Sequence, residues 1–141
     1  MRKCFFQVEY IYRDVNGDDH FFNIGYFSNN EKARLSIKEV EAKPGFIDTL
    51  GSFKINRIYV DFNDSDVIKA GAVLYEVSHE YLDSDGYDNF TIFGVYATYE
   101  EAKKVESKKR SHPDFCKHSE GFCISTVKVD LCEWKEGFSP W

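Results

Sequence analysis

The sequence contains one stretch twice, and this duplication constrains the fold more than any other feature. Residues 5–62 align with residues 74–131 at a constant offset of 69, without a gap. A repeated unit of this kind buries its apolar face by packing with its neighbour, so the repeat is interpreted before any single motif. The identical positions are mainly glycine, proline, aromatic and turn residues, as in the pairs Gly17/Gly86, Gly25/Gly94, Pro44/Pro113, Phe46/Phe115 and Phe53/Phe122.

The size of the chain bears on how the two copies are organised. A chain of 141 residues is long enough for one ordinary domain, whereas a single copy would be marginally stable alone. We therefore expect two repeats, residues 1–69 and residues 70–141, that form one compact unit. No apolar run approaches the roughly 18 residues of a membrane span, and no signal sequence is apparent, which predicts a cytoplasmic protein.

Local signals predict the element order β-β-α-β in each copy. Residues 3–13 alternate between apolar and polar side chains, and residues 75–81 repeat the pattern, as expected of strands. The dipeptides Asn16-Gly17 and Asp85-Gly86 are typical of hairpins. A glycine inside each second strand, Gly25 or Gly94, predicts a bulge or a close backbone approach.

The second half of each copy predicts a helix followed by a third strand. Ser28 and Thr98 each precede a glutamate by three residues, a pattern typical of helix starts, with an uncertainty of one residue in the cap. Pro44 and Pro113 require both helices to end before them. The apolar phase of the third strand slips near Asn56-Arg57 and near Ser125-Thr126, which predicts a further bulge.

These elements together predict an α+β fold of two tandem β-β-α-β repeats. The sheets should be mainly antiparallel, with one helix per repeat and an approximate twofold axis between the repeats. The extension from Trp134 to Trp141 contains too many aromatic residues for a loose tail, so we expect it to dock on the core.

One resemblance covers nearly the whole chain. The residues that carry it are Ile24-Gly25-Tyr26-Phe27-Ser28, Ala33, Pro44-Gly45-Phe46, Phe53-x-Ile55 and Glu136-Gly137-Phe138. This module resembles a short bacterial and phage domain of unassigned activity, here in tandem. In size and acidity the chain also resembles, more generally, the immunity proteins that neutralise bacterial toxins. Neither resemblance implies catalytic residues.

Charge is distributed unevenly between the halves. Residues 71–141 carry 8 basic and 13 acidic residues, and no Lys or Arg occurs between Lys69 and Lys103. Acidic and tyrosine residues alternate there, which favours a face that steers and anchors a basic partner, although a solvated hairpin tip has the same composition. The candidate partner-binding residues are Glu80, Tyr81, Asp83, Asp85, Tyr87, Asp88 and Tyr99.

Other classes of function have weaker support. The basic residues Lys103, Lys104 and Lys108-Lys109-Arg110 could hold phosphates, but glutamates at ion-pairing spacing share their helix, and the net charge of −6 disfavours nucleic-acid binding. No catalytic motif is present, and the spacing of Cys116, His118, Cys123 and Cys132 fits no zinc pattern. We therefore expect no metal and no cofactor.

Two hypotheses remain from the sequence. The first is a non-enzymatic binding protein, most concretely an immunity protein that neutralises a basic toxin, possibly a nuclease, at the acidic, tyrosine-rich face. The second is a small hydrolase or nucleotide-handling enzyme that uses a cleft between the copies.

Overall fold

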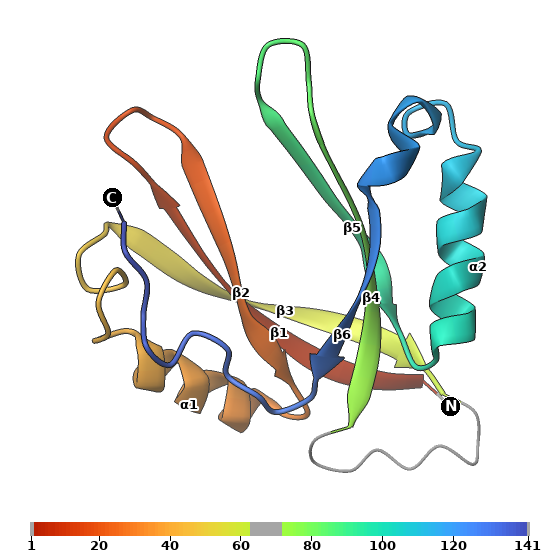
Figure 1. Cartoon of the computed structure of the whole chain (residues 1–141). Helices are drawn as coiled ribbons and strands as arrows, with labels where there is room; N and C mark the ends of the chain where they lie inside the picture. The colour runs from red at the N-terminus through yellow and green to blue at the C-terminus, as the bar shows by residue number, and fades with distance from the viewer. Residues whose placement is uncertain (1, 63–71, 141) are drawn as a thin grey trace. The chain divides into compact units, whose positions relative to one another are not determined.

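A computed structural model describes residues 2–62 and 72–140, which fold into two compact units (Figure 1). The first unit comprises residues 2–59, 72 and 128–140. The second unit comprises residues 60–62 and 73–127. The division is not the expected one at residues 69 and 70, because the end of the chain belongs to the first unit.

The first unit has the predicted element order. Strands β1 (Arg2–Arg13) and β2 (Asp19–Phe27) form a hairpin, helix α1 (Asn30–Val40) follows, and β3 (Gly51–Asp61) pairs with β1. The resulting antiparallel sheet has the strand order β2-β1-β3.

The second unit repeats this order. Strands β4 (Val73–Leu82) and β5 (Asp88–Tyr96) form its hairpin, helix α2 (Tyr99–Arg110) follows, and β6 (Phe122–Lys128) pairs with β4. A 3-10 helix, η1 (Cys116–Gly121), precedes β6, where the first unit has turns. The α+β fold of two similar halves is therefore confirmed.

Both hairpins contain the predicted bulge. The register of β1 with β2 shifts between Val8 and Glu9, next to Gly25 on the facing strand. The register of β4 with β5 shifts at the equivalent place, next to Gly94. In the third strands, the alternation of burial changes phase between Ile55 and Asn56 and at the equivalent place in β6, as the sequence predicts.

The helices begin and end close to where the sequence places them. The side chain of Asn29, one residue after Ser28, accepts a hydrogen bond from the Lys32 amide and caps α1. Thr98 caps α2 by accepting from the Glu101 amide. Both helices end before their prolines. Within the described residues, neither helix is long and apolar enough to cross a membrane.

An aromatic cluster forms the core of the first unit. Tyr10 and Tyr12 point from β1 into this cluster, as the alternation predicts, and their rings lie 6.1 Å apart. Phe46, from the turn after α1, is 4% exposed and packs edge-on against Tyr10 at 5.0 Å. The Tyr10 hydroxyl lies 2.6 Å from the Thr49 hydroxyl, so its polar end is hydrogen-bonded inside the cluster.

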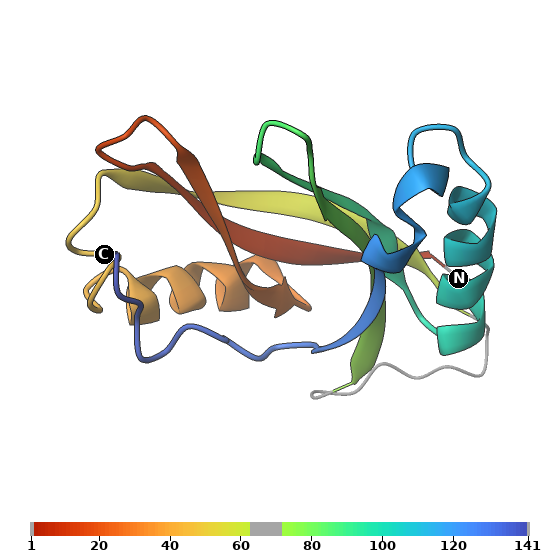
Figure 2. The same cartoon turned by 45° about the horizontal axis from the view of Figure 1, so that its top comes forward.

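The C-terminal segment, residues 128–140, completes this core. Val129 forms a parallel bridge with Tyr26, and the Trp134 indole donates a hydrogen bond to the Asn23 carbonyl at 2.8 Å. The Phe138 ring lies 4.4 Å from that of Phe22. Figures 1 and 2 show this segment running beside α1. The expected docking of the aromatic extension is confirmed, and its partner is the first repeat rather than the second.

Asp130 fastens this segment to the start of α1. Its carboxylate accepts hydrogen bonds from the backbone amide and hydroxyl of Ser28 and pairs with the Lys32 ammonium at 3.1 Å. Burial alone would raise the pKa of Asp130, but the Ser28 and Lys32 contacts outweigh it and hold the pKa below its ordinary value. The folded state therefore favours the ionised carboxylate.

The lowered pKa of Asp130 predicts that the attachment of residues 128–140 to the start of α1 weakens in acid. A lowered pKa stabilises the folded state above the unfolded carboxyl pKa, about 3.9, and this stabilisation is lost as the pH falls through the folded pKa. Asp130→Asn removes the charge, and asparagine tolerates the positive φ of 67° at this residue. We expect the substitution to cost about 1.5–3 kcal/mol at pH 7, as for hydrogen bonds to charged groups, and less at pH 2. Urea unfolding at both pH values measures this difference, and an equal cost at both would contradict the assignment.

Candidate partner-binding face

The sheet of the second unit has one face covered by α2 and one face without a helix. On the covered side, Lys109 and Arg110 of α2 lie over the rings of Phe93 and Phe122. His79 is buried on that side, and its Nε2 donates to the His118 carbonyl at 2.8 Å. His79 is therefore a packed imidazole of this side of the sheet.

The other face is built from residues that alternate with the covered ones. Directly opposed residues of an antiparallel pair share a face, and here the opposed pairs are Ser78 with Ile92, Glu80 with Phe90 and Leu82 with Asp88. Residues of η1 and β6 join them around a hollow of about 560 Å³. We call this surface the acidic face; its residues are Glu76, Ser78, Glu80, Leu82, Asp88, Phe90, Ile92, Glu120, Cys123 and Ser125.

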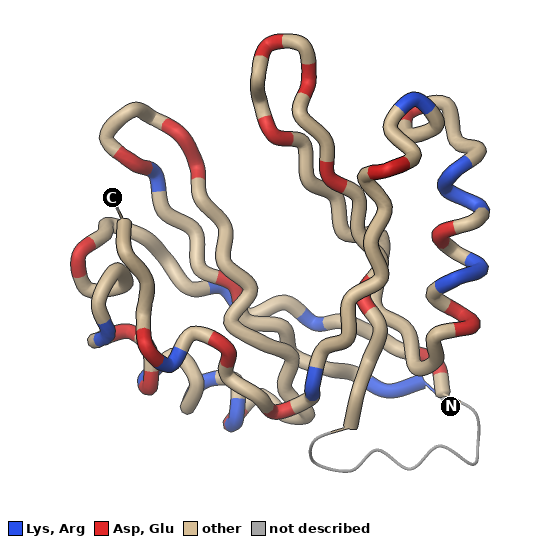
Figure 3. The backbone as a smooth tube through the Cα atoms, in the orientation of Figure 1, with Lys and Arg blue, Asp and Glu red and all other residues tan. Residues whose placement is uncertain are grey.

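Apolar side chains lie exposed on the acidic face among carboxylates. Leu82 is 69% exposed, Phe90 54% and Ile92 43%. The residues that line the hollow include four carboxylates and neither Lys nor Arg. In Figure 3, the β4–β5 hairpin carries acidic positions and no basic ones.

No family model, curated protein or solved structure matches the chain. The first unit therefore supplies the comparison, because its residues align with those of the second one for one. The positions equivalent to the hollow carry two carboxylates, Glu9 and Asp19, and two bases, Arg13 and Lys54. The two copies share one fold, but this face has balanced charge in the first unit and uniformly negative charge in the second.

Glu80 and Asp88 form a pair of neighbouring carboxyl groups on the acidic face. The negative charge of Asp88 raises the pKa of Glu80, and partial burial and a hydrogen bond between the two groups add to the effect. A shared proton relieves the repulsion between two adjacent carboxylates. A cation placed beside the pair would relieve it as well.

Three of the predicted partner-binding residues lie at the hairpin tip. Asp85 and Tyr87 are exposed there, and Tyr87 is 67% exposed. Asp83 instead holds the turn, because its carboxylate accepts from the backbone amides of Asp85 and Tyr87 at 2.9 and 3.0 Å. The Tyr87 amide, with help from Asn89 and the other turn amides, keeps the pKa of Asp83 below its ordinary value. Asp83 is therefore a structural residue of the hairpin.

The remaining predicted residues occupy two different places. Glu80 and Asp88 belong to the acidic face. Tyr81 lines the hollow beside Glu80 and Asp88, and its ring stacks on the His118 ring at 4.0 Å. Tyr99 is the first residue of α2 and packs against Tyr75, with the whole of β5 between it and the hairpin tip. The seven residues thus do not form one surface.

The basic residues of α2 are partly engaged by a buried carboxylate. Glu106 is 4% exposed and pairs with Lys103 and Arg110, each at 2.9 Å. Burial alone would raise the pKa of Glu106, but the hydrogen bonds from Lys103 and Arg110 outweigh it and lower the pKa. The ion-paired helix face that the sequence favours over a phosphate site is confirmed for these residues.

The four residues considered for a zinc site are divided between the two units. Cys132 belongs to the first unit, whereas Cys116, His118 and Cys123 belong to the second. Within residues 2–62 and 72–140, no three His, Cys, Asp or Glu side chains are placed to hold a metal ion.

Sequence reasoning did not include the apolar part of the acidic face. Leu82, Phe90 and Ile92 were not among the candidates, although the period-two rule places them on the face of Glu80 and Asp88 once the hairpin register is known. Glu120 could not have been found in this way, because η1 brings it to the sheet.

Proposed function

We propose that the chain is a non-enzymatic binding protein that docks a basic protein on the acidic face. In its most concrete form it is an immunity protein that neutralises a basic bacterial toxin. The observation that supports the proposal is a sheet face that combines exposed apolar side chains with three exposed carboxylates, Glu80, Asp88 and Glu120, where the duplicate has balanced charge.

The composition of the acidic face suits association with a protein. Exposed Leu82, Phe90 and Ile92 provide apolar area that a partner can bury, whereas scattered single apolar residues would not. The carboxylates attract a basic partner before contact, which raises the association rate more than the lifetime of the complex. Tyr87 at the hairpin tip offers further contact area.

The duplication provides a variant that tests this proposal with little risk to the fold. Glu80→Ile with Leu82→Arg gives the second unit the residues that the first unit has at these positions, Ile11 and Arg13. We expect this swapped variant to associate with its basic partner at least about tenfold more slowly at low salt, with a smaller difference at high salt. Wild type and variant serve as paired baits in the native host, and stopped-flow association then measures the rate for the captured basic protein.

A matched control has the same change in charge away from the acidic face. Glu100→Gln with Asp114→Asn alters two exposed carboxylates, in α2 and in the turn that follows it. This control should associate like the wild type. A basic protein captured equally well by the swapped variant, or an equal loss in the control, would contradict a role for the acidic face.

A further inference from the structure

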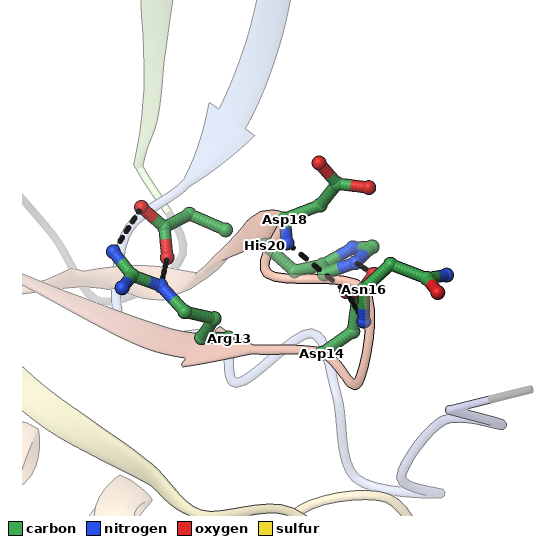
Figure 4. A network of polar contacts seen from close by, with 6 residues as sticks. Arg13, Asp14, Asn16, Asp18 and His20 are labelled. Atoms are coloured by element: carbon green, nitrogen blue, oxygen red, sulfur yellow. Dashed lines mark hydrogen bonds and ion pairs between the residues drawn. The ribbon is translucent and has the colours of Figure 1, made fainter.

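Asp19 and Asp88 are equivalent residues of the two copies, but the residues next to them differ. In the first unit, the Arg13 guanidinium donates two hydrogen bonds to Asp19, from Nε at 3.0 Å and from Nη2 at 3.4 Å; Figure 4 shows Arg13 with these contacts beside the hairpin turn. Asp88 is the equivalent of Asp19, and its opposed residue is Leu82 instead of an arginine. The second copy thus has the acid of this ion pair without its base.

A second substitution strengthens the negative charge at the same point. Ile11, which lies diagonally from Asp19 on the first sheet, is replaced by Glu80. Two carboxyl groups therefore lie where the first unit has an ion pair and an isoleucine. Leu82 and Phe90 flank them and line the same hollow with exposed apolar surface.

We propose that the acidic face binds an arginine side chain of the partner, and that its guanidinium takes the position beside Asp88 that the Arg13 guanidinium has beside Asp19. This inference rests on the proposed function and specifies its anchoring contact. The second carboxylate, from Glu80, accepts from the remaining guanidinium N–H groups.

The surroundings favour arginine over lysine. A guanidinium is planar, presents its N–H groups as a fork that matches carboxylates, and is less strongly hydrated than an ammonium group. It also stacks on aromatic rings, and the exposed ring of Phe90 is directly opposite Glu80. The hollow of about 560 Å³ lies in the size range of sites that accept small molecules or single side chains.

The test uses the full-length chain and a capped arginine, N-acetyl-arginine methylamide, with the lysine and citrulline counterparts as probes. Backbone amide shifts in NMR titrations report the site. We expect the arginine probe to shift residues of the acidic face with millimolar affinity, at least about threefold tighter than the lysine probe, while uncharged citrulline shifts none of them. Leu82→Arg should weaken the binding at least about tenfold, because an internal guanidinium then occupies the position.

The first unit allows the reciprocal experiment. Ile11→Glu with Arg13→Leu gives it the residues of the second unit, and a second set of shifts should appear around Asp19 while those around Asp88 remain. Equal shifts with arginine and lysine, shifts spread over all acidic residues, no shifts at all, or a Leu82→Arg variant that binds normally while folded would overturn the arginine assignment. The assignment can fail while a captured basic partner still depends on the acidic face, and that result would leave the proposed function standing.

Discussion

A chain that ends at Leu131 is expected to lose the folded first unit. Truncation there removes Trp134 and Phe138, whose rings both pack against Phe22, and it removes the buried Cys132. Loss of a fully buried large aromatic side chain costs about 3–5 kcal/mol, and a domain has only about 5–15 kcal/mol in total. Trp134 and Phe138 are partly buried, so each contributes part of that cost, and truncation also removes the backbone hydrogen bonds of the segment. Loss of both aromatic residues should therefore leave little stability in the first unit. Near-UV circular dichroism and the dispersion of its amide signals measure this loss.

Two further variants separate side-chain packing from chain length. Trp134→Ala with Phe138→Ala keeps the backbone hydrogen bonds of the segment and should destabilise the first unit less than truncation does. Leu50→Ala alters a side chain that is 99% exposed and should change stability by no more than about 0.5 kcal/mol. A truncated chain that unfolds like the wild type in urea would show that the segment contributes little to the core.

Gly45→Ala is expected to destabilise the first unit by about 2–5 kcal/mol, more than an identical substitution at Gly17. Both glycines have φ of +85°, so alanine is strained at either position by about 1–2 kcal/mol. At Gly17 a methyl group would meet open space, whereas at Gly45 it would collide with the carbonyl oxygen and ring of Phe138. Overpacking of this kind adds about 1–3 kcal/mol.

The comparison between the two glycines makes this prediction specific. Equilibrium urea unfolding of both variants gives the two free-energy changes under the same conditions. If Gly45→Ala costs no more than Gly17→Ala, the close approach of Phe138 to the turn after α1 is not what stabilises the first unit.

Much of the fold could be predicted because its signals are local. The hairpin at Asp85-Gly86, the cap at Thr98 and the helix stop before Pro113 each depend on a few neighbouring residues. Each of these local signals also has a counterpart in the first copy. The pairing of Phe138 with Phe22 has no such signal. Both residues are apolar in any arrangement, and only the complete fold decides which copy the last segment covers.

The candidate site was predicted in part for a related reason. The absence of Lys and Arg is seen in the order of residues along the chain. A binding face depends instead on which side chains the fold brings together on one surface. Tyr99 lies in the same acidic stretch as Tyr87, but an intervening strand of nine residues, roughly 30 Å long, separates them. Glu120, much further along the chain, lines the hollow with Glu80.

The attachment of residues 128–140 to the first unit has a consequence for synthesis. Hydrogen bonds such as those from Ser28 to Asp130 and from Trp134 to Asn23 join residues 102 and 111 positions apart. Domains usually fold in the order in which the ribosome releases them, N-terminal first. Here the half that is translated first lacks part of its core until residues 128–140 emerge, whereas residues 73–127 are translated before them. The later copy can thus reach its native structure while the earlier one waits for residues 128–140.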